Sequence, residues 1–415
     1  MNRILGSRAG SRRGAALLIA LVLALAMAGL CTALLAVNIS TKKSRVQDQG
    51  GQRAFYAAEA GLSDGFMQLT EGLVKPDLGE TVWIGTPEEP VAMGNSSYWV
   101  EIQPQGSRGY LVSSTGTDDA DESRLGLLLG KKADGFFQWA AFGADGVVLD
   151  QNAFIDSYDS AEGTWESQVT GGHDYAKENG HVGSNGDIVV KSNTEIHGDA
   201  RPGPGHIVND SAPGTLITGS KEPLEEPFLL PEITVPVAPS KGSLVGSSSL
   251  TLGPGLIRYD SILMQGGATL TIKGPAQIVT GNLTMKSNTN LNFDTAEGKI
   301  ELYSSKNFIL ESNSTVTTSS VSAVDVTLLL GGNNITKKPA DSLQLGANAD
   351  FVGAIYAPHA KFKLASNFNV YGSVMCQQLD LSSHGQIHFD GALLYDGWGA
   401  SDELDTKLWQ RLPRL

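Results

Sequence analysis

Two groups of histidines have the side-chain chemistry to bind a metal ion or to transfer protons. His173-Asp174 is followed by His181 in a glycine-rich stretch, and His384 is followed by His388. An imidazole ligates metals and acts as a general acid or base near neutral pH. Exposed polar residues in a glycine-rich loop need no such role, and the sequence has no nucleophile elbow, phosphate loop or zincin helix. We therefore expect no catalytic residue, no metal and no cofactor.

Proteolytic processing is the second chemistry that the sequence suggests. Four arginines within the first 13 residues precede Ala15–Val37, which has no charged side chain, and the first acidic residue is Asp48. Twenty-three helical residues at about 1.5 Å each are long enough to cross a hydrocarbon core of about 30 Å. The basic flank predicts a cytoplasmic N-terminus and export of everything after Lys42.

Three classes of N-terminal segment fit this pattern. A cleavable secretory signal has a shorter apolar core and an Ala-x-Ala type site, which the sequence lacks. An uncleaved signal anchor is the second class. The third is a prepilin-type leader, in which residues 1–14 are removed by cleavage between Gly14 and Ala15 and the apolar segment stays.

An amphipathic helix is predicted directly after the apolar run, so that residues 15–75 form one membrane and periplasmic helical region. Gly50-Gly51 predicts a kink or a break between its two halves. The second half carries a stripe of apolar residues at helical spacing, which consists of Phe55, Leu62, Phe66, Leu69 and Leu73.

The string Phe55-Tyr56-Ala57-Ala58-Glu59-Ala60-Gly61-Leu62, about forty residues after Gly14-Ala15, resembles the N-terminal region of PilX-type minor pilins. The general-secretion pseudopilin of the K type is similar at the junction itself. The resemblance covers about residues 12–75. It implies cleavage by prepilin peptidase, association with other pilins and an assembly platform in the inner membrane, and filament packing through Ile19, Phe55, Tyr56, Glu59 and Leu62.

Ile19 departs from the pattern of major pilins, which carry a glutamate at that position. A carboxylate inside a bilayer is costly unless a partner offsets it. Because Ile19 offers no carboxylate to a neighbouring subunit, we expect a low-copy subunit at the filament tip.

The charge of the exported part excludes one class of partner. All 44 acidic residues and 26 of the 30 basic residues lie beyond residue 41, which gives a formal charge near −18. Nucleic-acid binding requires basic surfaces that neutralise phosphates, so we expect none. Cys31 lies in the apolar run and Cys376 far beyond it, so a disulfide between them is not expected.

Residues 76–140 are predicted to form a small β-rich, pilin-like region. Three strand-like runs, at 98–102, 110–113 and 125–129, are separated by Gly, Ser and Asp. A helix followed by a small antiparallel sheet is the arrangement of a pilin head.

Residues 141–396 contain an irregular repeat of about 13 to 25 residues, with an apolar–x–apolar strand, a small polar corner and another short strand. Asn tolerates the left-handed backbone that a tight corner requires, and His384 occupies that position in the last copy. The pattern predicts an all-β right-handed solenoid, with a β-sandwich or a propeller as alternatives. The clearest copies begin at Val147, Ile188, Leu283, Phe308, Phe362 and Leu379.

Two segments of this region have a different composition. Residues 199–240 contain eight prolines and are expected to form either an extended strap over the solenoid or a spacer between domains. Residues 397–415 are expected to be a C-terminal tail. The region 141–396, with Phe351–Pro358 as its clearest part, is similar to an uncharacterised β-solenoid domain found behind PilX-type N-termini, with some likeness to bactofilins.

Two functions follow from these patterns. The first is a minor pilin or pseudopilin, a structural subunit of a type IV pilus or related secretion filament that displays its solenoid for contact with a surface or glycan. It would be a single-pass inner-membrane protein with its bulk in the periplasm, and extracellular once assembled. The alternative is a membrane-anchored β-helix enzyme or carbohydrate-binding protein that acts on extracellular polysaccharide.

Overall fold

The chain forms two compact units, which are described separately. The computed structural model describes residues 11–76, 79–106, 108–119, 121–311, 313–331, 343–345, 350–364 and 366–413. The first unit comprises Met1–Lys131 and Glu403–Leu415, and the second comprises Lys132–Asp402. The second unit is thus an insertion within the first.

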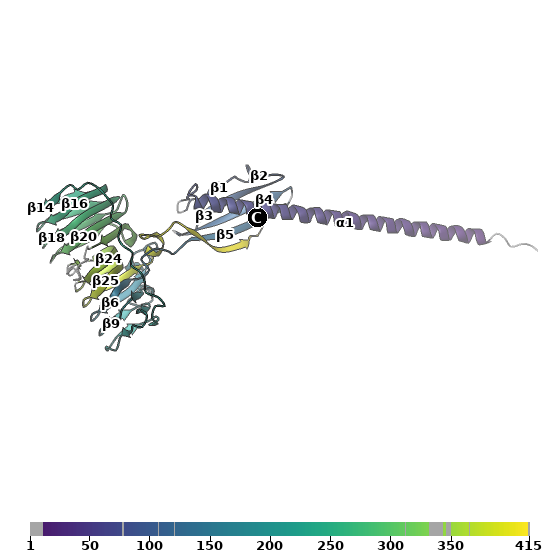
Figure 1. Ribbon diagram of the computed structural model, residues 1–415. Helices are drawn as coiled ribbons and strands as arrows, with labels where there is room; N and C mark the ends of the chain where they lie inside the picture. Colours follow the sequence, from purple (N-terminus) through teal and green to yellow (C-terminus); the bar gives the residue numbers. More distant parts are fainter. Residues whose placement is uncertain are drawn as a thin grey trace, which may run out of the picture. The chain divides into compact units, whose positions relative to one another are not determined.

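The first unit begins with α1 (Ser11–Thr70), a single helix of 60 residues (Figure 1). Its segment Leu21–Lys43 has a mean hydropathy of 2.3 and is long and apolar enough to cross a membrane. The helix continues through Gly50-Gly51, so the break expected there is absent. Packing of the following turns against a sheet stabilises the helix more than two glycines destabilise it.

An antiparallel sheet covers one face of the second half of α1. Its order is β1-β3-β4-β5-β27, with β2 paired to β3. Strands β3, β4 and β5 contain the three runs predicted from sequence. The bounds are β1 (Val82–Ile84), β2 (Val91–Met93), β3 (Ser96–Pro104), β4 (Gly109–Asp118), β5 (Asp121–Lys131) and β27 (Leu404–Arg411).

Strand β27 corrects the expectation of a C-terminal tail. It pairs antiparallel with β5, from Leu404 opposite Lys131 to Arg411 opposite Leu125. Nearly all of its side chains are exposed. An edge strand without a buried face lacks the apolar alternation by which strands are recognised in sequence.

The second unit is built from short strands whose described ladders are all parallel. The helices in its described residues are short: α2 (Trp165–Gln168), η1 (Ala323–Asp325) and α3 (Leu393–Asp396). The strands are β6 (Ala141–Leu149), β7 (Phe154–Tyr158), β8 (Val182–Ser184), β9 (Ile188–Val190), β10 (Glu195–Ile196), β11 (Ala200–Arg201), β12 (Val208–Asn209), β13 (Leu216–Ile217), β14 (Ser243–Gly246), β15 (Leu250–Leu252), β16 (Gly255–Met264), β17 (Thr269–Lys273), β18 (Ala276–Met285), β19 (Asn290–Asp294), β20 (Ile300–Leu310), β21 (Thr315–Thr318), β22 (Val326–Leu330), β23 (Leu343–Leu345), β24 (Asp350–Leu364), β25 (Asn369–Leu381) and β26 (Gln386–Asp390).

The order of the strands in space differs from their order in the chain. From β14 the ladder runs through β16, β18, β20, β22, β24 and β25 to β6, which then pairs with β8 and β9 (Figure 1). Strand β6, the first of this unit in sequence, therefore lies between β25 on one side and β8 and β9 on the other.

The strand register of this unit matches the sequence repeat. Leu283 lies opposite Phe308, Phe362 opposite Leu379, and Leu379 opposite Val147. Apolar positions of successive copies are thereby stacked in one continuous core. The predicted corner residues have positive φ: 57° at Asn152, 54° at Asn193, 61° at Asn288, 60° at Asn313, 56° at Asn367 and 59° at His384.

The proline-rich segment lies against strands of this same unit. The Asn185 side chain donates to Phe228 O at 2.8 Å and accepts from Phe228 N at 2.7 Å. Tyr356 Oη donates to Pro231 O. Apolar side chains of the segment pack on the core, at Leu224, Phe228, Leu230, Ile233 and Val235.

Candidate functional site

The contact between α1 and its sheet depends on small residues. Ala54, Ala57 and Ala58 are fully or almost fully buried. A Cβ placed on Gly116 of β4 would overlap the helix backbone at Ala54 and Ala58. A Cβ on Gly61 would likewise meet Ser114 and Tyr98. The helix and sheet backbones therefore approach as closely as they do because both surfaces lack side chains at these points.

Two of the helical residues predicted for filament packing face this sheet, and two do not. Leu62 is 4% exposed, and Phe55 is half-buried with its ring 6.5 Å from that of Trp409. Tyr56 is 60% exposed and Glu59 is exposed. Tyr56 and Glu59 are thus free of the sheet and accessible to another chain.

The other predicted residues of the helix are described by backbone alone. Gly14, Ala15 and Ile19 lie in α1, and their side chains fall outside the described part of the structure.

His388 is a buried residue in a polar and aromatic environment. Its Nδ1 lies 2.6 Å from Asp156 Oδ1, and both side chains are fully buried. Asp156 also accepts from the Trp165 indole N–H at 2.7 Å, and the Trp165 ring lies 4.2 Å from the imidazole. The Tyr371 ring stacks on His388 at 4.8 Å. Asp156, Trp165 and Tyr371 thus hold His388 inside the core of the second unit.

The structure does not bring His384 and His388 together as a pair. His384 lies at an exposed corner, where its Nε2 is 3.2 Å from Asn152 Nδ2 of the neighbouring corner. Its backbone N–H donates to Gln151 O at 3.1 Å. His384 therefore continues the row of corner residues.

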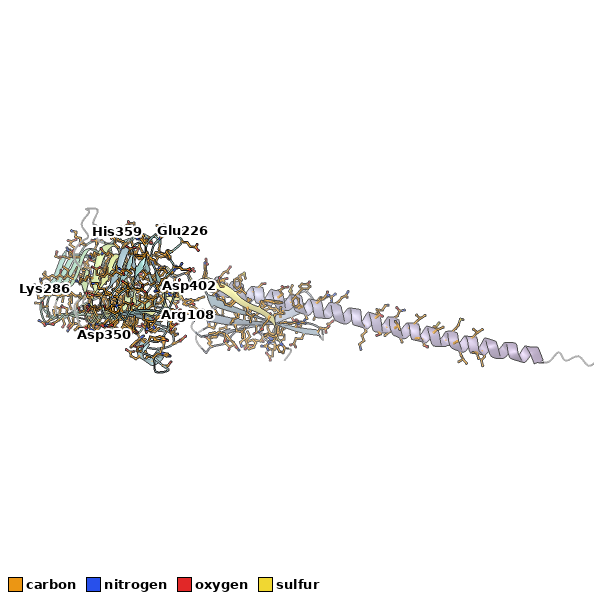
Figure 2. The ribbon with its side chains drawn as sticks, turned by 90° about the horizontal axis from the view of Figure 1, so that it is seen from below. Arg108, Glu226, Lys286, Asp350, His359 and Asp402 are labelled. Atoms are coloured by element: carbon orange, nitrogen blue, oxygen red, sulfur yellow. The ribbon has the colours of Figure 1, made fainter. Side chains whose placement is uncertain are left out.

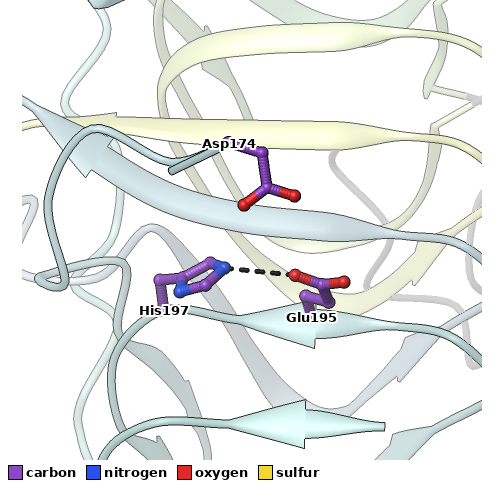
Figure 3. Close-up of side chains that lie close together, drawn as sticks. All are labelled: Asp174, Glu195 and His197. Carbon is purple, nitrogen blue, oxygen red and sulfur yellow. Dashed lines mark hydrogen bonds and ion pairs between the residues drawn. The ribbon is translucent and has the colours of Figure 1, made fainter. Parts of the chain in front are cut away.

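In the first histidine group, Asp174 lies beside two residues from outside the glycine-rich stretch. Ligand atoms of Asp174, Glu195 and His197 lie within 4.8 Å of one another (Figure 3). His197 is 2% exposed, and its Nε2 is 3.3 Å from Glu195 Oε2. Sequence spacing did not indicate Glu195 and His197, because they flank a buried Ile196 within a repeat copy and lie 21 and 23 residues beyond Asp174.

His181 instead contacts Asp199, the residue directly before β11. Its Nδ1 accepts from Asp199 N–H at 3.0 Å, and burial of the ring lowers the pKa of His181 below its usual value near 6.5. Burial therefore disfavours the protonated form of this ring.

Another candidate surface is the outer face of the four-stranded sheet β15-β17-β19-β21. Thr251, Thr271, Asn292 and Thr317 are in register across it and are exposed or half-buried. Thr317 Oγ1 donates to Asn292 Oδ1 at 3.0 Å. A parallel row, Thr269–Asn290–Thr315, runs beside the first. We call these seven residues the Thr/Asn face.

Charged side chains lie beside the two rows and elsewhere on the second unit. Lys273 and Asp294 are register partners two residues beyond Thr271 and Asn292, and Lys273 pairs with Glu297 at 2.9 Å. Lys286 pairs with Glu311 at 2.6 Å, and His359 of β24 pairs with Glu232 at 2.8 Å (Lys286 and His359 are labelled in Figure 2). The Thr/Asn face thus offers hydroxyl and amide groups without a charged side chain in either row.

Comparison with known proteins matches part of the second unit. Residues 238–395 match the family model of a domain of unknown function (DUF7305). No curated protein matches the chain.

Solved structures share no more than a distant likeness. The competence-associated pilin ComZ from Thermus thermophilus is 11% identical over 88% of this chain and 97% of its own, with a TM-score of 0.29. An ice-binding protein from the Antarctic ascomycete Antarctomyces psychrotrophicus is 11% identical over 62% of this chain and 98% of its own, with a TM-score of 0.26.

Proposed function

We propose that this chain is a minor pilin or pseudopilin, a structural subunit of a type IV pilus or related secretion filament. The observation that carries the proposal is α1: one helix whose first half is apolar and exposed and whose second half packs through small residues on an antiparallel sheet. Such a helix can leave the bilayer and pack in a filament without refolding of the head. The PilX-like string from Phe55 to Leu62 spans this contact.

The partners follow from this proposal. Prepilin peptidase would cut between Gly14 and Ala15 at the cytoplasmic face, and the helix would then join other pilins through the assembly platform. Tyr56 and Glu59 would face neighbouring subunits, since both are exposed on the packed half of α1. Ile19 favours a position at the tip. The chain would reside in the inner membrane with its bulk in the periplasm, and on the cell surface after assembly.

The mature N-terminus tests the proposal. Mass spectrometry of the chain from its native membrane should find Ala15 as the first residue, and Gly14→Leu should abolish both cleavage and recovery in sheared filaments. Gly10→Leu is the matched control and should be processed normally. An intact Met1 in the native chain would overturn the proposal and favour a membrane-anchored enzyme or carbohydrate-binding protein without a filament.

We propose further that the second unit is a right-handed β-solenoid that the filament displays. Parallel ladders with stacked apolar positions and left-handed corners support coils wound around one core. The proline-rich segment would be a strap along these coils.

The Thr/Asn face is the proposed contact with a surface glycan. Regular rows of hydroxyl and amide groups match the donors and acceptors of a neutral, hydroxyl-rich polysaccharide, while the acidic chain would repel anionic polymers. Thr271→Lys and Thr317→Lys should lower retention of the chain on cellulose or chitin at least fivefold. Thr284→Lys, at a half-buried threonine of β18 outside the face, is the control. Equal retention of all variants would contradict this role.

A further inference from the structure

We propose that Asp174, Glu195 and His197 form a binding site for a divalent transition-metal ion, with Zn²⁺ as the best fit. The site joins the tip of the loop between α2 and β8 to strand β10, which belongs to the neighbouring coil. The proposal stands apart from the pilin function and concerns how this part of the second unit is held.

The donor set suits such an ion. One imidazole nitrogen and two carboxylates converge, with their ligand atoms within 4.8 Å of one another (Figure 3). Zn²⁺ binds nitrogen at about 2.0–2.1 Å and carboxylate oxygen at about 2.0–2.2 Å. Asp174 is exposed on its loop, so its side chain can rotate to shorten the remaining distance. The nitrogen donor favours Zn²⁺ and its neighbours over Ca²⁺ and Mg²⁺, which prefer oxygen.

His197 is the buried ligand of the set. It is 2% exposed, and its Nδ1 is buried without a hydrogen-bond partner. Its Nε2 points at the two carboxylates, and its described polar contact is with Glu195 alone, inside the cluster itself. A metal on Nε2 would replace this contact with Glu195 while Glu195 stays in the cluster as a second ligand, so no other hydrogen bond of the imidazole is lost.

The histidine is held rigidly in this orientation. The Tyr175 ring stacks on it at 4.0 Å with an interplanar angle of 18°, and Phe154 lies 5.3 Å from it. A ligand whose orientation is fixed in advance loses less entropy when the metal binds. Tyr175 also belongs to the loop, so the loop supplies both a ligand and the ring that positions His197.

The electrostatics of the cluster favour a cation. Two carboxylates lie close together, and no described ion pair joins either of them to a lysine or arginine. Their mutual repulsion is relieved when a divalent ion lies between them.

The metal would complete the attachment of the loop. Nearer its C-terminal end, the loop is already bound to β7, since Ala176 N donates to Asp156 Oδ2 at 2.9 Å and Asn179 N donates to Ser157 Oγ at 2.8 Å. Strand β10 is the parallel neighbour of β7. A metal held by Asp174, by Glu195 of β10 and by His197 directly after β10 would therefore fix the loop across two coils and over the buried Asp156.

Zinc titration of the full chain in detergent micelles tests the site. After removal of metals with EDTA, isothermal titration should find one Zn²⁺ per chain. Asp174→Asn and Glu195→Gln should each weaken binding at least tenfold. Asp187→Asn is the matched control, because Asp187 pairs with His206 at 2.9 Å and offers a two-residue site.

Proteolysis gives a second measurement that does not depend on a variant of the buried His197. Zn²⁺ should slow tryptic cleavage after Lys177 in the loop at least fivefold in the native chain, and not in Asp174→Asn. Ca²⁺ at the same concentration should give no protection. The proposal is overturned if the native chain binds no Zn²⁺, or if Asp174→Asn and Glu195→Gln bind it as the control does.

Discussion

The corner residues show how single side chains set the path of the second unit. At six corners the backbone adopts positive φ, five times with Asn and once with His384. Gly214 and Gly267 lie beside the corners at Asn193 and Asn288. They have φ of 76° and 80° and adopt the same left-handed backbone conformation. Gly267 N–H donates to Asn288 O at 3.0 Å, so neighbouring corners are also hydrogen-bonded. Because few residue types other than Gly tolerate a left-handed backbone, Asn recurs at the corners, and this recurrence makes the repeat visible in the sequence.

Asn288 is a direct test of this corner rule. Asn288→Val should destabilise the second unit by about 1–2 kcal/mol, the cost of a left-handed conformation for an ordinary side chain, while Asn288→Gly should be nearly neutral. Urea unfolding followed by circular dichroism measures both. Asn292→Val, in the extended strand β19, is the control for loss of an amide and should cost less than Asn288→Val.

His181 predicts a dependence of stability on pH. Its pKa is lowered in the folded state because burial disfavours the charged ring; nearby Arg201 adds to this and Asp199 opposes it. The unfolded chain therefore binds more protons just below pH 6.5, and stability falls as the pH decreases through this range. The urea midpoint should drop between pH 7.5 and 5.5, and the drop should be smaller in His181→Asn. Asp187, with a lowered pKa, contributes only below about pH 4.

At the scale of elements, α1 shows that the closest contact of a helix need not follow its apolar stripe. The predicted stripe includes Leu62 and Leu69, which are buried. Leu73 is 68% exposed because α1 ends at Thr70, before the predicted end at residue 75. The surface that meets β4 is instead the row of small residues around Ala58 and Gly61. Large side chains flank this row and small ones set the distance between the backbones.

Two glycines on α1 should therefore respond in opposite ways to the same substitution. Gly61→Ala places a methyl against Ser114 and Tyr98 and should destabilise the first unit by about 1–3 kcal/mol. Gly51→Ala meets no atom within 4 Å and should stabilise the helix by about 1 kcal/mol. Thermal unfolding of the two variants in detergent measures the difference. Equal effects at the two positions would show that the sheet does not control this packing.

Strands with a buried face could be predicted from the sequence. Features that depend on contacts between residues far apart in the chain could not. Strand β3 alternates between buried and less buried residues, and β4 and β5 each contain a run of consecutive buried residues; the predicted positions of all three were confirmed. Alternation does not encode which strand lies beside which, so the pairing of β25 with β6 could not be read from it. The convergence of Asp174 with Glu195 and His197 could not be predicted for the same reason, since it depends on the pairing of β7 with β10.

At the scale of the whole molecule, the second unit is an insertion into the edge of the first sheet. The chain leaves β5 at Lys131 and returns at Leu404, and these two residues are register partners. Both connections between the two units therefore start at the same end of the β5–β27 pair. This arrangement permits a large domain to be added without rearrangement of α1 or of the sheet that covers it.

Removal of the inserted unit tests this organisation. Because partners in an antiparallel pair are about 5 Å apart, Lys131 and Leu404 can be joined by a two-residue Asn-Gly turn. The joined chain should keep the helix, the sheet and a structured environment for Trp409, as measured by circular dichroism and tryptophan fluorescence. A chain that ends at Lys131 lacks β27, exposes the β5 edge and should aggregate. If the joined chain aggregates to the same extent, the first unit depends on the second and is no independent head. If it folds and is still recovered in sheared filaments, assembly resides in the first unit and display in the second.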